Sequence, residues 1–269
     1  MFSLWVALVI GIVEGLTEFL PVSSTGHMIL VGHMIGFTGE KAETFEVVIQ
    51  LGAILAVAVI YWKRVLRLFG YNDREARAKP RRINLLHIAL AIVPALGLAF
   101  VLRDYIKLLF MPETVVIGLV AGGIFMIIGE KRQPTVTVRD MDDLSYRQAL
   151  FVGIAQCLSL WPGFSRSGST IAAGMLAGAS RAAAADFTFL IAIPVMCAAT
   201  GYELLKSIGS MTADDLGFLA AGFIVSFVVA LIAVATFIKL VGKLSLTYFS
   251  YYRFALAAVV LVYMYTAGF

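Results

Sequence analysis

The stretch "EGLTEFLPVSSTGH", residues 14–27, decides how this chain folds, because it interrupts an apolar run with acids, hydroxyls, a proline and a histidine. Apolar sequence lies on both sides of it, up to Val13 and again from Met28. A polar break of this kind separates two helices. We therefore predict a helix, a polar turn and a second helix within residues 3–34.

The whole chain has the composition of an integral membrane protein. Of its 269 residues, 61% are hydrophobic and 14% are charged, and the mean hydropathy is +0.93. Soluble domains contain about 45–50% apolar residues. Because lipid offers the backbone no hydrogen-bond partner, and because no strand-like alternation recurs, the expected fold is all-α.

Six apolar segments are long enough to cross about 30 Å of hydrocarbon. They are residues 45–62, 83–102, 114–129, 186–205, 216–238 and 249–267. The loop at 63–82 carries eight Lys or Arg against two acids, which places it in the cytoplasm by the positive-inside rule. A nucleic-acid role for this loop is the less favoured interpretation. The parity of the spans then puts both termini outside.

A shift of 142 positions aligns the chain with itself and sets "EGLTEFLPVSSTGH" over "QCLSLWPGFSRSGS", residues 156–169. Ser23 then aligns with Ser165, and Gly26 with Gly168. The second segment is also too polar to span without interruption. It is therefore predicted to form a second helix, break and helix.

Each half of the chain then holds one broken segment followed by three spans, and an odd number of spans inverts the second half. We predict a single membrane domain, residues 1–269, with repeats at 1–133 and 148–269. Each repeat begins with a re-entrant hairpin, at about 3–34 and 148–180. In inverted repeats the sites lie near the midplane, so the two hairpin tips are expected to meet there.

Both tips are candidate anion sites. Each places hydroxyls and a glycine directly before an apolar helix, where Ser and Thr cap the helix and free N–H groups attract anions. Capping alone is the simpler alternative for either tip. The candidate phosphate-binding residues are Ser23, Thr25, Ser165, Arg166 and Ser167.

Arg166 adds a charge that costs about 2.5–3.5 kcal/mol at membrane depth, and its forked guanidinium suits phosphate oxygens. A structural ion pair with Glu14 or Glu18 is the alternative. These two acids are spaced i, i+4 on one helix face and require a cation. A divalent metal shared with substrate phosphates suits Mg²⁺. Neutralisation by Arg166, or one protonated glutamate, would serve equally.

His27 follows the first tip directly and is expected near Ser24, Thr25 and the acids. It is a candidate general acid, general base or nucleophile. A packed structural role is the alternative. His33 and His87 are interpreted as structural.

The motifs "EGLTEFLPVSSTGH" and "PGFSRSGST" (residues 162–170) together resemble the undecaprenyl pyrophosphate phosphatase family of bacteria, of the bacitracin-resistance type. The resemblance extends over nearly the whole chain. It implies hydrolysis of undecaprenyl pyrophosphate to the monophosphate, which recycles the lipid carrier for cell-wall synthesis. It also implies a bacterial cytoplasmic membrane protein whose site opens towards the periplasmic face.

By this resemblance, the active residues of the first motif are Glu14, Glu18, Ser24, Thr25 and His27, and those that hold phosphate in the second are Ser165, Arg166 and Ser167. The resemblance also implies a divalent cation; we expect Mg²⁺ or Ca²⁺, with Glu14 and Glu18, from their spacing, as its candidate ligands. The expected partners are a polyprenyl pyrophosphate lipid and membrane lipid, with no nucleic acid; a homodimer is compatible with the sequence.

A polyprenyl-phosphate transporter or flippase is the main rival, because transporters also use inverted repeats with broken helices. A purely structural membrane scaffold is the weaker rival, since it leaves the intramembrane charges without a role.

Overall fold

The computed structural model describes residues 3–71, 83–207 and 215–268, which form helices, turns and an isolated backbone bridge between Val138 and Ala179. This confirms the all-α prediction. In chain order the α-helices are α1 (Leu4–Thr17), α2 (Ser24–Met34), α3 (Glu40–Leu68), α4 (Leu85–Leu108), α5 (Pro112–Lys131), α6 (Tyr146–Gln156), α7 (Arg166–Leu176), α8 (Arg181–Ser207), α9 (Leu216–Leu240) and α10 (Leu246–Tyr263). The 3₁₀ turns η2 (Met141–Asp143) and η3 (Cys157–Leu160) flank α6, and a π-helical turn, η6 (Met264–Gly268), follows α10.

Six helices in the described part of the chain are long and apolar enough to cross a membrane, namely α3, α4, α5, α8, α9 and α10. They match the six predicted spans. Their polar ends run further than predicted, since α3 begins at Glu40 and α8 at Arg181. The apolar segment used for the prediction ends at the first polar residues, whereas the hydrogen bonding of the helix continues through them. Residues 72–82 of the predicted cytoplasmic loop lie outside the described residues.

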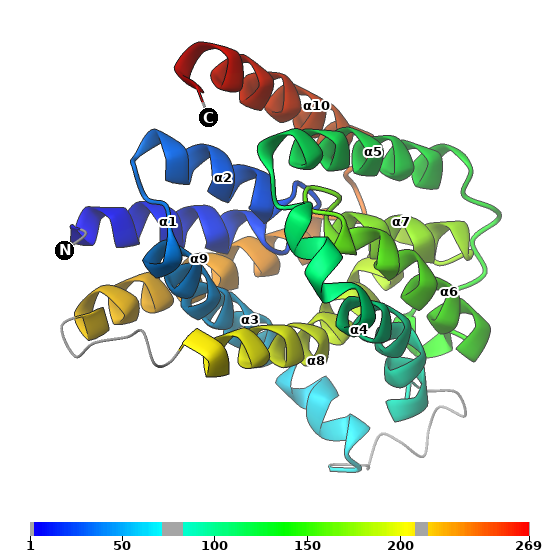
Figure 1. The fold of residues 1–269 in the computed structure, drawn as a ribbon. Helices are drawn as coiled ribbons and strands as arrows, with labels where there is room; N and C mark the ends of the chain where they lie inside the picture. The colour runs from blue at the N-terminus through cyan, green and yellow to red at the C-terminus, as the bar shows by residue number, and fades with distance from the viewer. Residues whose placement is uncertain (1–2, 72–82, 208–214, 269) are drawn as a thin grey trace.

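The two remaining segments are both broken helices, as predicted. The chain is not α-helical between α1 and α2, or between α6 and α7, and in Figure 1 α2 runs back beside α1. Whether these hairpins re-enter a bilayer stays a prediction. So does the division of the domain into repeats at 1–133 and 148–269.

The two breaks share one local geometry. Each ends in a serine with a positive φ, 70° at Ser23 and 75° at Ser165, a conformation that residues other than glycine rarely adopt. Each of these serines caps the next helix, because its Oγ accepts a hydrogen bond from Gly26 N (3.5 Å) or Gly168 N (3.2 Å). The same backbone solution therefore occurs 142 residues apart, as expected of a repeat.

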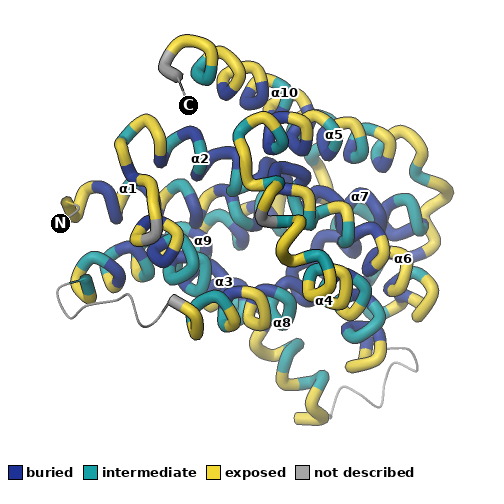
Figure 2. The backbone as a smooth tube through the Cα atoms, in the orientation of Figure 1, coloured by how far each residue is buried: buried dark blue, intermediate teal, exposed yellow. Residues whose placement is uncertain are grey.

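Helix α7 lies at the centre of the fold. Every residue from Ser167 to Met175 is buried, and its neighbours include α5, α6 and α8. In Figure 2 this region is dark blue, whereas the outer faces of α4 and α10 are exposed. Those outer faces carry large apolar side chains such as Phe100 and Val262. Apolar faces of this extent fit contact with lipid.

Candidate active site between two helix breaks

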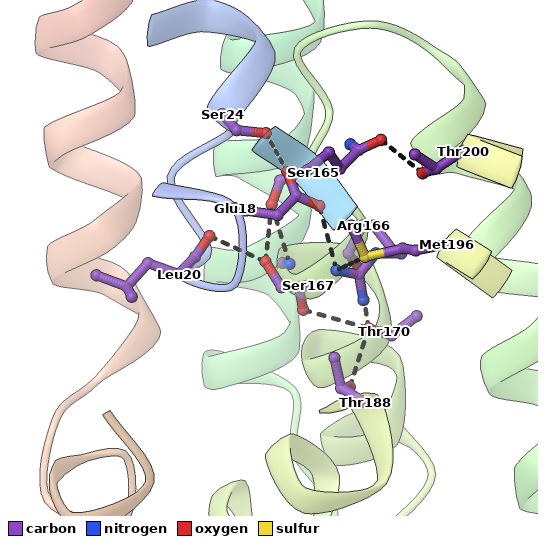
Figure 3. A network of polar contacts seen from close by, with 12 residues as sticks. Glu18, Leu20, Ser24, Ser165, Arg166, Ser167, Thr170, Thr188, Met196 and Thr200 are labelled. Atoms are coloured by element: carbon purple, nitrogen blue, oxygen red, sulfur yellow. Dashed lines mark hydrogen bonds and ion pairs between the residues drawn. The ribbon is translucent and has the colours of Figure 1, made fainter. Parts of the chain in front are cut away.

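The first tip, residues 18–26, and the second tip, residues 161–168, contact each other directly (Figure 3). Arg166 Nη2 lies 3.4 Å from Glu18 Oε1, and Ser167 Oγ donates a hydrogen bond of 3.0 Å to the carbonyl oxygen of Leu20. The predicted meeting of the two tips is therefore observed. It brings an acid of one half of the chain beside a cation of the other.

Glu18 uses both carboxylate oxygens. Oε1 pairs with Arg166, and Oε2 accepts a hydrogen bond of 2.5 Å from Ser24 Oγ. The side chains of Glu18 and Arg166 are 8% and 12% exposed, so this ion pair is largely withdrawn from solvent. A hydroxyl bonded to a carboxylate has the arrangement of a nucleophile with its base. This hydrogen bond keeps Ser24 a candidate nucleophile.

Arg166 is only partly satisfied by the protein. Besides Glu18, Nη2 lies 3.2 Å from Met196 Sδ, and the guanidinium carbon lies 5.4 Å from the ring centroid of Phe19. The other terminal nitrogen, Nη1, is buried without a hydrogen-bond partner. Because burying an unpaired charged donor is costly, this nitrogen indicates an anionic ligand.

Glu14 lies one turn before Glu18 on α1 and is 4% exposed. Its carboxylate interacts electrostatically with Glu18, Glu46 and Arg166, and its Oε1 is buried without a hydrogen-bond partner. An orphaned carboxylate oxygen beside a second acid is an environment that fits a cation. Within residues 3–71, 83–207 and 215–268, no group of three or more His, Cys, Asp or Glu gathers to ligate a metal. A metal held here would need substrate or water oxygens as further ligands, which suits Mg²⁺.

His27 contacts different groups from those expected of it. Nδ1 lies 2.8 Å from the carbonyl oxygen of Ser23, and Nε2 lies 2.6 Å from the hydroxyl of Tyr252 on α10, with the two rings stacked. A carbonyl only accepts, so Nδ1 carries the proton and Nε2 of the neutral ring accepts from the tyrosine. Both ring nitrogens are engaged. This geometry favours a role in holding the first tip over nucleophilic attack.

The candidate hydroxyls mainly hold the backbone. Ser23 and Ser165 cap α2 and α7, and Ser165 Oγ also lies 3.2 Å from Ser167 Oγ. Thr25 is half-buried in the first turn of α2. Capping fixes the starts of both helices at the junction, where their free N–H groups favour an anion.

Sequence reasoning missed Arg253, which is fully buried on α10. Its Nη2 donates to the carbonyls of Gly163 (2.7 Å), Phe164 (2.8 Å) and Gly118 (3.1 Å). The signal was present, because an arginine inside an apolar span is costly and is kept for a purpose. Tyr252 and Arg253 are adjacent, so α10 supports the first tip through one residue and the second tip through the next.

The fold and the site together define a class: a polytopic helical membrane protein with a buried acid, hydroxyl and guanidinium cluster suited to a phosphorylated ligand. The family described as bacitracin resistance protein BacA matches residues 7–259, and the chain belongs to this family. It is 52% identical over 265 residues to undecaprenyl-diphosphatase 1 of Bacillus thuringiensis (strain Al Hakam), a match that covers 98% of this chain and 99% of that protein. The resemblance seen in the two motifs is therefore confirmed.

Proposed function

We propose that this protein hydrolyses undecaprenyl pyrophosphate to undecaprenyl phosphate and inorganic phosphate at the junction of the two tips. The similarity to an undecaprenyl-diphosphatase over nearly the full length supports this activity. The observation that carries the site is the pair of buried, unpartnered atoms, Arg166 Nη1 and Glu14 Oε1. A donor of a cation and an acceptor of an anion, both buried without a hydrogen-bond partner at one junction, suit an anionic ligand and its counter-cation.

Arg166 and the two helix starts bind the phosphate. In phosphoryl transfer, negative charge spreads over the equatorial oxygens of the transferred group. The free Nη1 donates to one of these oxygens, while the first N–H groups of α2 and α7 face the same charge. Donors fixed in place before the reaction stabilise such a transition state most effectively.

Ser24 is our candidate for the attacking group. Its Oγ attacks the terminal phosphorus, the bond from that phosphorus to the bridging oxygen breaks, and the lipid monophosphate leaves. The serine proton passes to Glu18, which already accepts the hydrogen bond. Water then hydrolyses the phosphoserine, which releases inorganic phosphate and restores the hydroxyl. A water molecule attacking directly, with Glu18 as base, is the alternative.

Glu14 and Glu18 are the residues that would hold a divalent cation, Mg²⁺ or Ca²⁺. Such an ion supplies positive charge to the phosphate oxygens. Glu14 is the better ligand of the two, because its Oε1 has no hydrogen-bond partner in the protein.

We place the protein in the bacterial cytoplasmic membrane, with the junction open to the periplasmic face and both termini outside. The product is the monophosphate carrier lipid, so the reaction recycles that carrier for cell-wall synthesis. Nucleic acid has no part in this function. A homodimer is compatible with it.

Purified protein in detergent, given undecaprenyl pyrophosphate and Mg²⁺, tests the proposal. We expect one inorganic phosphate per lipid, and no release in excess chelator. Trapping of a phosphoenzyme separates the two routes, since only serine attack labels Ser24 with phosphate. If labelled lipid crosses the bilayer of reconstituted vesicles while no phosphate appears, the protein is a transporter and the hydrolase proposal is wrong.

A further inference from the structure

An apolar groove of about 300 Å³ lies beside the second tip, outside the cluster of polar residues described above. Its walls come from the second half of α4, the first half of α5, and η3 with the residues that follow it. Every lining residue is apolar or a cysteine, among them Leu102, Ala121, Cys157, Trp161 and Phe164. The volume is at the lower end of the range for small-molecule sites.

The groove adjoins the second tip through Trp161 and Phe164. Phe164 lines it, and the next two residues along the chain are Ser165 and Arg166. The α-carbons of Phe164 and Arg166 therefore lie at most about 7.6 Å apart, the length of two peptide units. The groove therefore begins within two residues of the arginine that we assign to the phosphate.

Close packing fixes the position of α5 against the second tip. A Cβ on Gly118 would lie 2.1 Å from Pro162 O, and one on Gly122 would lie 2.3 Å from Phe164 O, so only glycine lets α5 approach the second tip this closely. Trp161 Nε1 also donates a hydrogen bond of 2.8 Å to the carbonyl of Thr114. Ile117 and Ala121, each directly before one of these glycines on α5, line the groove.

We propose that this groove binds the first isoprenoid units of the lipid substrate, those next to the pyrophosphate. The proposal rests on the function proposed above. A free acyl chain of the bilayer has the same polarity, but a chain covalently joined to a bound headgroup has a high effective concentration at the groove. Headgroup and groove together therefore select a diphosphate that carries a long apolar chain.

The first experiment narrows the groove with Ala121→Phe. The matched control is Ala258→Phe, which places the same ring in an open apolar hollow of about 360 Å³ on α10. For farnesyl diphosphate, we expect Ala121→Phe to raise KM by about tenfold to a hundredfold, the discrimination typical of a change in an apolar pocket. The inhibition constant of inorganic pyrophosphate, which has no chain, should stay within about twofold of the wild-type value. The control should change neither.

An unchanged KM in folded Ala121→Phe protein would overturn the proposal, as would an equal rise for pyrophosphate, which would show damage to the headgroup site. The wild-type protein is assayed first. If it releases no phosphate from any prenyl diphosphate, the proposed function fails, whereas the second experiment still tests the groove.

The second experiment leaves the groove intact and uses Cys157 as its reporter. Cys157 lines the groove, and Cys197, on α8, is removed by Cys197→Ser. A non-hydrolysable prenyl methylenediphosphonate should slow modification of Cys157 by an apolar maleimide several-fold. Inorganic pyrophosphate and phosphatidylethanolamine at the same concentration should not. Equal protection by phosphatidylethanolamine would show a general lipid groove and refute the assignment.

Discussion

The two tips share the backbone conformation of their last serine and carry different charged groups. Ser23 and Ser165 share a positive φ and cap the following helix in the same way. At the shift of 142, however, Glu18 aligns with Leu160 and Ser24 aligns with Arg166. One tip therefore carries the acid and the hydroxyl, whereas the other carries the cation. In the proposed function neither half holds a complete site, so we expect activity to require contact between the two tips.

The tips also differ in how α10 holds them. The first is held through the side-chain pair of His27 and Tyr252, which has one hydrogen bond at each ring nitrogen. The second is held by Arg253, which donates directly to the backbone carbonyls of Gly163 and Phe164. Losing a buried charged donor leaves several acceptors unsatisfied, so the second tip should be the more sensitive to loss of its support.

Arg166→Ala should have the largest effect on activity. The change removes the cation of the second tip, and we expect kcat/KM for undecaprenyl pyrophosphate to fall about 10³-fold or more. Arg166→Lys should recover only part of the lost activity, because an ammonium group cannot form a bidentate contact with phosphate. Arg103→Ala, at a half-exposed arginine on α4, is the matched control. Wild-type turnover in folded Arg166→Ala protein would remove the second tip from the site.

Glu18→Gln tests the first tip with a nearly isosteric change. The amide keeps a partner for Ser24 and loses both the negative charge and the basicity, so we expect kcat to fall about 10²- to 10³-fold. Melting in detergent checks that the protein is folded, and Glu43→Gln at an exposed position of α3 is the control. A drop in kcat of less than about tenfold would show that Glu18 does not act as the base.

Arg253→Met should destabilise the protein more than it alters any single catalytic contact. Four backbone carbonyls, those of Gly118, Leu119, Gly163 and Phe164, lose their charged donor. We expect the free energy of unfolding to fall by about 3 kcal/mol or more. Denaturant titration in detergent measures this. If Arg253→Met lowers the free energy of unfolding less than Tyr252→Phe does, the second tip is not the more sensitive one and the comparison is reversed.

Tyr252→Phe should have the smallest effect. It removes the hydroxyl that donates a hydrogen bond to His27 and keeps the stacked ring. We expect the free energy of unfolding to fall by about 1 kcal/mol and kcat to fall about fivefold to tenfold. Tyr251→Phe, at the exposed neighbouring position, should match wild type. An effect as large as that of Glu18→Gln would instead make His27 a participant in the chemistry.

The membrane helices could be predicted from sequence because each span is a long apolar run of the required length. The ends could not, since α3 starts with the polar residues that follow Gly39. The contact between the tips was predicted from an inverted repeat, and that repeat itself stays a prediction. Roles for Glu14, Glu18 and Arg166 stay predictions, although the structure brings them together.

The supports on α10 could not be predicted from local patterns. His27 and Tyr252 are 225 residues apart, and no local periodicity indicates their contact. Arg253 was visible as a charge inside a span, but its partners are backbone carbonyls, which sequence does not distinguish. The apolar groove depends on the close approach of α5 to the second tip, which is a property of packing.

A double-mutant cycle on kcat/KM between Glu18→Gln and Arg166→Ala tests most directly whether the two tips act on one phosphate. When two groups act on the same phosphate, removing the second costs little once the first is gone. The kcat/KM of the double mutant should therefore be no more than about tenfold below that of the less active single mutant. If the two losses multiply in full, the tips act independently, and a shared site is contradicted.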